Sequence, residues 1–275
     1  MKQQISTTLI ITTYNWPQAL QLCLDSLKRQ SELPDEVIIA DDGSTDDTKA
    51  VIDAFRPQLP CPLKHVWQED RGFRRSAILN KALRATSPNH YVIFIDGDVI
   101  LHKHFIADHC RLAEPGYYVF GRRVLPTKET SNRILCEPKF TIHFFTPGID
   151  HRLNLLYLPW LTPLTVSYKR HKVYGFGCNL AAWLDDIITI NGYNEEMEGW
   201  GCEDTDFILR LRNNGLVSKA AKFQAIVVHI WHPQQPVSEE NKRIYARLVE
   251  KKELRCEYGI SYPQNIDNDK AHQDD

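Results

Sequence analysis

The stretch YVIFIDGDVILHKHF, residues 91–105, joins an apolar run to two carboxylates. Asp96 and Asp98 follow the apolar residues 91–95, with only Gly97 between them. A short apolar run bounded by glycine predicts a buried strand over residues 91–96. Carboxylates at the edge of a core are costly unless something pairs with them. The stretch therefore predicts a polar or metal-bearing ligand at the end of this strand.

Strand-like and helix-like segments alternate before this stretch. The expected strands are residues 6–14, 35–42 and 63–68, and the expected helices are residues 15–30, 43–55 and 74–86. Asn15 is expected to cap the first helix. This alternation predicts right-handed β-α-β units and a parallel sheet.

The C-terminal half is less regular. The expected strands are residues 117–125 and 223–232, and the expected helices are residues 204–215 and 238–255. Ser238 is expected to cap the last helix. Residues 126–173 are rich in aromatic residues and proline and have no clear period, and the last ten residues are expected to form a frayed tail.

The composition of the chain argues against several classes of protein. The chain has 275 residues, 43% of them apolar and 25% charged, which fits one large α/β domain or two small ones. The formal charge of −2 argues against a nucleic-acid binder. Seven cysteines without a Cys-x-x-Cys pair argue against a zinc ribbon and fit a reducing cytoplasm. We expect a soluble cytoplasmic protein, since no signal peptide or membrane-length apolar run is evident.

Two acidic clusters follow predicted strands. Asp41 and Asp42 come after the second strand, and Asp96 and Asp98 come after the fourth. In an open parallel sheet, ligands bind at the carboxyl ends of the strands. A lone aspartate there often only caps a helix or turn, but two clusters at one edge favour a polar ligand. Aspartates at i and i+2 can hold Mg²⁺ or Mn²⁺, with phosphate oxygens completing the shell.

Four motifs share their order and spacing with a known family. They are TTLIITTYNWPQALQLCLDSLKRQ, VIIADDGSTDDT, EDRGFRRSAILNKAL and FIDGDVIL. Together they resemble family 2 glycosyltransferases of the GT-A fold. A later block, NGYNEEMEGWGCEDTDFILRLRNNG at residues 191–215, is similar to the Gly-Trp-Gly-x-Glu-Asp segment of β-1,4-galactosyltransferases and chondroitin-polymerase-like bacterial enzymes.

The resemblance implies a Rossmann-like, mostly parallel α/β sheet flanked by helices in a single domain. Residues 1–115 would form a nucleotide-sugar-binding half and residues 116–235 an acceptor-binding and catalytic half. Residues 236–275 would form a C-terminal helix and tail.

The resemblance also implies contacts to a UDP-sugar donor. Base and ribose contacts would come from Thr12, Tyr14, and Asp41 or Asp42, and Tyr14 has an ordinary strand-end role as its alternative. Phosphate contacts would come from Arg71, Arg74 and Arg75, since a guanidinium suits bidentate donation, with a solvated helix face as the alternative. Asn80 fits the family pattern or serves as polar packing. Gly177 and Asn179 would wall the donor sugar.

A metal site is implied at the same edge. Asp98 would ligate Mn²⁺ or Mg²⁺ directly, and Asp96 would contact the ribose or a water on the ion. The run IVVHIWHP offers His229 as a further ligand, with His232 as the neighbouring candidate. An imidazole in the shell favours Mn²⁺ over Mg²⁺.

The Gly-Trp-Gly block supplies acids for the acceptor. By the family motif, Asp204 is the base that inverting transfer needs, and Glu203 orients the acceptor. Acids are also favoured in the first turn of any helix, which is the ordinary alternative. Trp200 would offer an apolar face to a sugar ring, in a loop made mobile by Gly199 and Gly201.

The expected function is inverting, metal-dependent transfer of a hexose or N-acetylhexosamine from a UDP-sugar. The acceptor would be a glycan or lipid-linked glycan in bacterial polysaccharide or lipopolysaccharide synthesis. Without a Gln-x-x-Arg-Trp motif, single addition is expected. The rivals are a nucleotidyltransferase, which would need a Gly-rich basic loop where this chain has TTYNWPQ, and a non-catalytic binding module.

Two segments could contact a partner that the sequence does not identify. Residues 126–173 could form an acceptor groove, a dimer interface or a membrane contact. The basic helix at residues 240–255 could meet anionic lipid at the cytoplasmic face of the inner membrane. A solvated helix with interleaved glutamates is the more ordinary interpretation of that helix.

Overall fold

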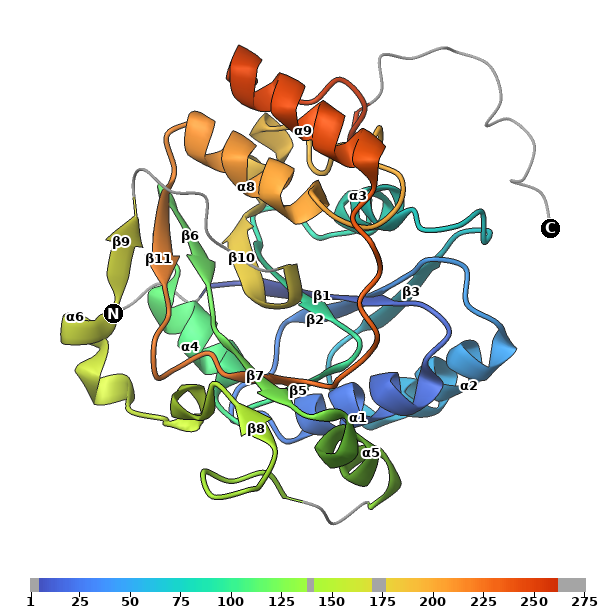
Figure 1. Ribbon diagram of the computed structural model, residues 1–275, viewed down its shortest axis with the longest axis vertical. Helices are drawn as coiled ribbons and strands as arrows, with labels where there is room; N and C mark the ends of the chain where they lie inside the picture. The colour runs from blue at the N-terminus through green and yellow to red at the C-terminus, as the bar shows by residue number, and fades with distance from the viewer. Residues whose placement is uncertain (1–4, 138–140, 170–176, 262–275) are drawn as a thin grey trace.

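The computed structural model describes residues 5–137, 141–169 and 177–261, and its centre is a large mixed sheet (Figure 1). The strand order is β3-β2-β1-β4-β10-β6-β11-β9. The strands are β1 Thr7–Thr13, β2 Glu36–Asp41, β3 Leu63–Trp67, β4 Tyr91–Asp96, β6 Tyr117–Phe120, β9 Ser167–Lys169, β10 Leu180–Trp183 and β11 Val217–Ala220. The first four are mutually parallel, which confirms the expected β-α-β units.

Register brings the carboxyl ends of these strands together. Thr12 pairs with Asp96 across β1 and β4, and Thr13 pairs with Asp41 across β1 and β2. The two acidic clusters therefore lie at one edge of the sheet, as the sequence predicts.

Helices cover both faces of the sheet. The apolar side chains on one face of the sheet pack on α1 Pro17–Lys28, α2 Asp46–Phe55 and α4 Phe105–Leu112. The other face packs on α3 Arg75–Arg84, α7 Leu184–Thr189 and α8 Glu203–Asn213. α9 Glu239–Lys251 lies beside α8, and α5 Lys128–Cys136 lies beside α1 (Figure 1). This three-layer arrangement confirms the predicted α/β class.

A second, smaller sheet has the order β5-β12-β7-β8. Its strands are β5 Val99–Leu101, β7 Arg123–Pro126, β8 Ile149–Asp150 and β12 Val227–His229. The single strand predicted at residues 117–125 is wrong, because β6 and β7 belong to different sheets. Gly121 lies at the break, where a Cβ would come 2.0 Å from the amide nitrogen of Asn179. Close packing with a residue far along the chain therefore divides this strand.

The two predicted helix caps have different outcomes. Ser238 caps α9, since its hydroxyl accepts a hydrogen bond from the Asn241 amide. Asn15 is not a cap: Trp16 precedes α1 and makes no side-chain cap bond. Instead, the side-chain oxygen of Asn15 accepts from the Thr45 amide at 2.9 Å, which ties the end of β1 to the loop after β2.

The two predicted halves share the large sheet, because β10 pairs antiparallel with β4. Among the described residues, no helix combines the length and apolarity needed to span a membrane. The tail predicted for the last ten residues lies outside the described part of the chain.

Candidate active site

Arg75 bonds carboxylates from two parts of the fold, the end of β4 and the start of α8. Its Nη2 donates to Asp96 Oδ1 at 3.0 Å, and its Nη1 donates to Asp204 Oδ1 at 2.7 Å. The Thr12 hydroxyl donates to the same Asp96 oxygen at 2.9 Å. Arg75 is buried and was predicted to contact phosphate, but both terminal nitrogens contact carboxylates of the protein. The end of β4 is thereby linked to the start of α8.

The two adjacent acids at the start of α8 have different surroundings. Asp204 accepts from Arg75 and, through Oδ2, from the Gly177 amide at 3.1 Å. Glu203 is only 6% exposed, and its Oε2 has no hydrogen-bond partner among the described residues. Burial, assisted by the charge of Asp204, raises the pKa of Glu203 to about 7. Asp204 is thus held by short contacts. Glu203, whose Oε1 lies 3.9 Å from Arg75 Nη1, is poised to exchange a proton near neutrality.

The Gly-Trp-Gly loop before α8 is held by its backbone. The Gly199 amide donates to the Phe73 carbonyl at 2.9 Å, and the Ser238 amide donates to the Trp200 carbonyl at 2.8 Å. The buried Asn241 side chain donates to the carbonyls of Gly199 and Gly201. These bonds argue against the mobility expected for this loop. Sequence reasoning missed Asn241, which looks like any polar residue of an amphipathic helix.

A second cluster comprises Asp98, His229 and His232, whose candidate ligand atoms lie within 4.8 Å of one another. His229 Nε2 lies 3.6 Å from Asp98 Oδ1, and His232 Nε2 lies 3.5 Å from Asp98 Oδ2. The structure brings both candidate histidines together instead of choosing between them.

Hydrogen bonds indicate which imidazole nitrogens are free. His229 Nδ1 lies 3.1 Å from the Ile230 carbonyl, and His232 Nδ1 lies 3.0 Å from the Pro233 carbonyl. A carbonyl only accepts, so each Nδ1 carries its ring's proton and each Nε2 of a neutral ring presents a lone pair to Asp98. Asp98 Oδ1 is buried without a hydrogen-bond partner among the described residues. Lone pairs facing an orphaned carboxylate oxygen fit a divalent cation.

A neighbouring group of possible ligands comprises Asp96, Cys178 and His229. Burial raises the pKa of the Cys178 thiol, which disfavours the thiolate that a metal would bind. Asp96 also shares one oxygen between Arg75 and Thr12. The set of Asp98 with the two histidines therefore fits a cation better.

The first acidic cluster lies at the end of β2 with its oxygens already bonded. Asp41 accepts from the Ser44 amide at 2.8 Å and from His65 at 2.9 Å. Asp42 accepts from the Gln68 side chain at 2.6 Å and from the Arg74 amide at 2.8 Å. Both carboxylates order the loops at this edge, and a uracil contact by either stays a prediction.

Tyr14 and Arg71 lie on the rim of this edge. The exposed Tyr14 hydroxyl donates to Asp70 at 2.9 Å. Arg71 is exposed and pairs with Glu69 at 2.6 Å, so the structure does not bring it to the other charged residues of the site. Gly43 makes the approach of these loops feasible: its φ is +96°, and a Cβ there would lie 2.5 Å from Asp70 Cα.

Two asparagines of the predicted site are buried and hydrogen-bonded within the protein. Asn179 is fully buried; its Oδ1 pairs with His109 at 3.0 Å, and its amide donates to the Ala225 carbonyl at 2.8 Å. These bonds give Asn179 a packing role, with partners that the local sequence does not reveal, and its donor contact stays a prediction. Asn80 is also buried and bonds the Tyr193 backbone, consistent with its alternative as polar packing.

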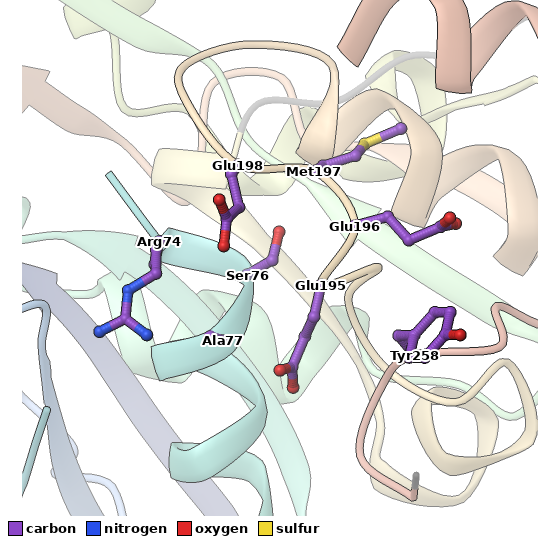
Figure 2. A pocket seen from close by; sticks show the side chains of 8 residues that line it. All are labelled: Arg74, Ser76, Ala77, Glu195, Glu196, Met197, Glu198 and Tyr258. Carbon is purple, nitrogen blue, oxygen red and sulfur yellow. The ribbon is translucent and has the colours of Figure 1, made fainter. Parts of the chain in front are cut away.

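A pocket of about 360 Å³ lies beside the Gly-Trp-Gly loop (Figure 2). Its walls are the start of α3, the loop before Gly199, and a C-terminal aromatic residue. The lining residues are Arg74, Ser76, Ala77, Glu195, Glu196, Met197, Glu198 and Tyr258. The lining holds three carboxylates and one guanidinium. It therefore favours ligands that carry hydroxyl or amine donors over anionic ligands. Sequence reasoning did not predict this pocket.

Comparison with known proteins identifies the family. The family model described as Glycosyl transferase family 2 matches residues 8–167, more than half of the chain. The chain belongs to glycosyl transferase family 2. A second model, described as the N-terminal domain of galactosyltransferase, matches residues 164–233 of this family 2 protein. That range contains the Gly-Trp-Gly block and both histidines.

Curated relatives of this family 2 chain are longer than it is. It is 28% identical over 235 residues to validoxylamine A glucosyltransferase of Streptomyces hygroscopicus subsp. limoneus, covering 76% of the chain and 48% of that protein. It is 25% identical over 274 residues to chondroitin synthase of Escherichia coli, covering 89% of the chain and 38% of that protein. The chain thus spans about half of these relatives or less.

Solved structures share the fold. One is the mannosyltransferase PcManGT of Pyrobaculum calidifontis, in complex with GDP-Man and Mn²⁺, with a TM-score of 0.60, 18% identity, and coverage of 85% of this chain and 59% of that one. Another is Staphylococcus aureus TarS in complex with UDP-GlcNAc, with a TM-score of 0.62, 17% identity, and coverage of 90% and 66%. They confirm the predicted GT-A-type architecture.

Proposed function

We propose that this family 2 chain is an inverting, metal-dependent glycosyltransferase. It moves a hexose or N-acetylhexosamine from a UDP-sugar to a hydroxyl of a glycan or lipid-linked glycan. The observation that supports this most directly is the Arg75 bridge, because it bonds Asp96, two residues before Asp98, to Asp204 at the start of α8. UDP-GlcNAc in TarS and Mn²⁺ in PcManGT support the donor class and the metal.

The two halves have separate roles in this proposal. Residues 1–115 bind the nucleotide sugar, with Tyr14, Asp42 and Arg74 near the base and phosphates. Residues 116–235 bind the acceptor and supply the acids, and α9, within the C-terminal segment, supports the Gly-Trp-Gly loop through Asn241. Trp200 stacks on the acceptor sugar.

Asp98, His229 and His232 would hold the divalent ion, and two imidazoles favour Mn²⁺ over Mg²⁺. When bound, the ion would neutralise charge on the departing diphosphate. Arg75 holds the carboxylates of Asp96 and Asp204 in place through its two ion pairs. Asp96, fixed by Thr12 and Arg75, then contacts the ribose with its other oxygen.

Asp204 is the proposed base. The acceptor oxygen forms its bond to the anomeric carbon while the bond from that carbon to UDP breaks, and the acceptor proton passes to Asp204. Glu203 orients the acceptor hydroxyl by a hydrogen bond. The attack takes place opposite the leaving group, so the anomeric configuration inverts.

The test is release of UDP from UDP-glucose, UDP-galactose and their N-acetyl forms, with Mn²⁺ and a panel of glycans. We expect turnover with at least one donor, and EDTA should abolish it. Asp204→Asn should retain UDP binding within about threefold and lower transfer at least about a hundredfold. Near-normal transfer by this variant would contradict the base assignment.

Two rival functions have distinct outcomes in the same assay. A nucleotidyltransferase would form a nucleotide-sugar and pyrophosphate from a nucleoside triphosphate. A binding module would bind the nucleotide without releasing UDP. The loop from Thr13 to Pro17 contains no glycine, which disfavours a nucleotidyltransferase.

The proposed setting is single addition during bacterial polysaccharide or lipopolysaccharide synthesis, at the cytoplasmic face of the inner membrane. Helix α9 offers little to a lipid surface, since it pairs several of its cations with glutamates. These pairs are Lys242–Glu239, Arg243–Glu240 and Arg247–Glu196. Contact with a membrane must therefore come from another surface.

A further inference from the structure

The pocket beside the Gly-Trp-Gly loop contains a buried hydroxyl that forms no hydrogen bond within the described protein. Ser76, in the first turn of α3, is 2% exposed and lines this pocket. Its Oγ has no hydrogen-bond partner among the described residues. Figure 2 shows this hydroxyl pointing from α3 toward the loop that carries Glu195 and Glu198. A buried hydroxyl is costly unless it is hydrogen-bonded, which indicates a ligand that supplies the missing bond.

The walls of the pocket are held in place by hydrogen bonds. The Asn80 side-chain amide donates to the Tyr193 carbonyl at 2.8 Å and to Glu195 Oε1 at 2.9 Å. The Glu195 amide donates to the Tyr258 carbonyl at 2.9 Å, which ties the loop to the segment after α9. The volume of about 360 Å³ lies in the range of small-molecule sites, roughly 300–1,000 Å³. The pocket is therefore preformed for a small ligand.

The pocket is distinct from the proposed transfer centre. Its lining contains no residue of the candidate metal cluster and neither acid at the start of α8. Arg75 and Ser76 are neighbours on α3, but Arg75 bonds Asp204 whereas Ser76 lines the pocket. Successive residues of an α-helix point about 100° apart, so one turn of α3 contributes to both places.

The polar groups of the pocket offer both kinds of hydrogen bond. The carboxylates of Glu195 and Glu198 accept, the Arg74 guanidinium only donates, and the Ser76 hydroxyl does either. An ammonium ligand would only donate, and a carboxylate or phosphate ligand would mainly accept, so each would leave part of this set unpaired. The hydroxyls of a sugar both donate and accept, and they match the whole set.

The remaining lining residues agree with an uncharged ligand. Glu196 is already paired with Arg247 at 2.9 Å, which offsets its negative charge. Tyr258 is 40% exposed and offers an aromatic ring, against which the C–H groups of a sugar ring can pack. Figure 2 shows Tyr258 and Arg74 on opposite sides of the pocket. The pocket thus combines an aromatic surface with a few polar groups, as small-molecule sites do.

We infer that this pocket binds an uncharged sugar unit, at a site separate from glycosyl transfer. The Ser76 hydroxyl and the carboxylates of Glu195 and Glu198 bond the sugar hydroxyls, and Tyr258 packs against the ring. Such a site holds a glycan at a second point, which raises the apparent affinity for a longer chain. The inference concerns binding alone and does not depend on the transfer reaction.

The test is a ligand-observed NMR titration with the methyl glycosides of glucose, galactose, mannose and N-acetylglucosamine, without a nucleotide or a metal. We expect at least one of them to bind. Ser76→Ala should weaken that binding about three- to tenfold, the effect of one lost hydrogen bond. This variant should unfold at the same temperature as the parent or a higher one, because the hydroxyl has no partner among the described residues.

A second variant fills the pocket. Ala77→Trp places a large side chain in the pocket wall and should lower the affinity at least about tenfold. Ala50→Trp, at an exposed position of α2, is the matched control and should bind like the parent. Analogues of the bound sugar with a carboxylate or an ammonium group in place of one hydroxyl should bind more weakly.

Three results would overturn the inference. The first is that none of the four glycosides binds the parent protein. The second is unchanged affinity in Ser76→Ala or in Ala77→Trp, which would place the bound sugar elsewhere. The third is a preference for a charged analogue, which would contradict the match of donors and acceptors.

Discussion

At the residue scale, several charged side chains of the site bond one another. Arg75 neutralises Asp96 and Asp204, while Asp98 faces two histidines without a cation of the protein between them. The first group is satisfied within the chain, but the second is not. The second group is therefore the better candidate for holding the metal.

The metal assignment predicts an effect of His232. His232→Ala should lower the affinity for Mn²⁺ at least about tenfold, because it removes one of three converging ligand atoms. Titration calorimetry with Mn²⁺ measures this without reference to turnover. His104→Ala, which removes an imidazole bonded to Ser31, is the matched control and should bind like the parent. Unchanged affinity in His232→Ala would remove His232 from the set of ligands.

Glu203 predicts a pH-dependent stability. Its pKa is raised to about 7 in the folded chain, chiefly by burial, so the native state holds this proton where the unfolded state has lost it. Stability from this group is therefore present below about pH 4 and declines as the pH rises to about 7, by on the order of 3 kcal/mol. Glu203→Gln removes that penalty.

We therefore expect Glu203→Gln to exceed the parent in unfolding free energy at pH 8 and to equal it at pH 4. Urea unfolding at both values measures the difference. The exposed Glu250→Gln is the control and should follow the parent at both. Identical pH profiles of parent and Glu203→Gln would show that the group titrates normally.

At the element scale, α8 is anchored by a fully buried ion pair. Asp206 accepts three hydrogen bonds from Arg210, whose Nη1 also donates to the carbonyls of Ile190 and Gly192 at 2.7 Å. The pair connects the helix that begins with Glu203 to the loop after α7. It thus fixes the acids of the site from the far side of the helix.

Asp206→Asn should lower the free energy of unfolding by about 3–5 kcal/mol, because a buried guanidinium loses its counter-charge. Lys49→Ala breaks the exposed pair with Asp53 at the same i, i+4 spacing and should cost about 0.5 kcal/mol or less. Urea unfolding of both variants makes the comparison. Equal losses would contradict the burial argument.

The elements differ in how well their sequence predicts them. β1 to β4 and α1 to α3 follow from periodic apolar runs, because each run is buried on a parallel sheet. The strands β5, β8, β9 and β10 are too short to show a periodic pattern of apolar residues. The split between β6 and β7 depends on Asn179, which lies far along the chain. Local pattern cannot report such contacts.

At the scale of the whole molecule, the sequence locates the site better than it assigns the contacts. Asp98 and His229 lie in one cluster, and Asp204 bonds the same arginine as Asp96, while the roles of all three stay predictions. Arg71, Asn179 and Arg75 fit the motif but have partners within the protein, which only three-dimensional packing reveals. The pocket is formed by residues of two motifs far apart in the sequence, and only the fold shows that they are neighbours.

The most direct test of the account is thermal unfolding with UDP, GDP and CMP, each with and without Mn²⁺. A ligand at about 100 times its dissociation constant adds about 2.7 kcal/mol, or roughly 5–10 °C for a chain of this size. The account predicts this shift with UDP when Mn²⁺ is present and little with UDP alone. A larger shift with GDP or CMP would contradict the donor, and equal shifts with and without Mn²⁺ would contradict the metal site.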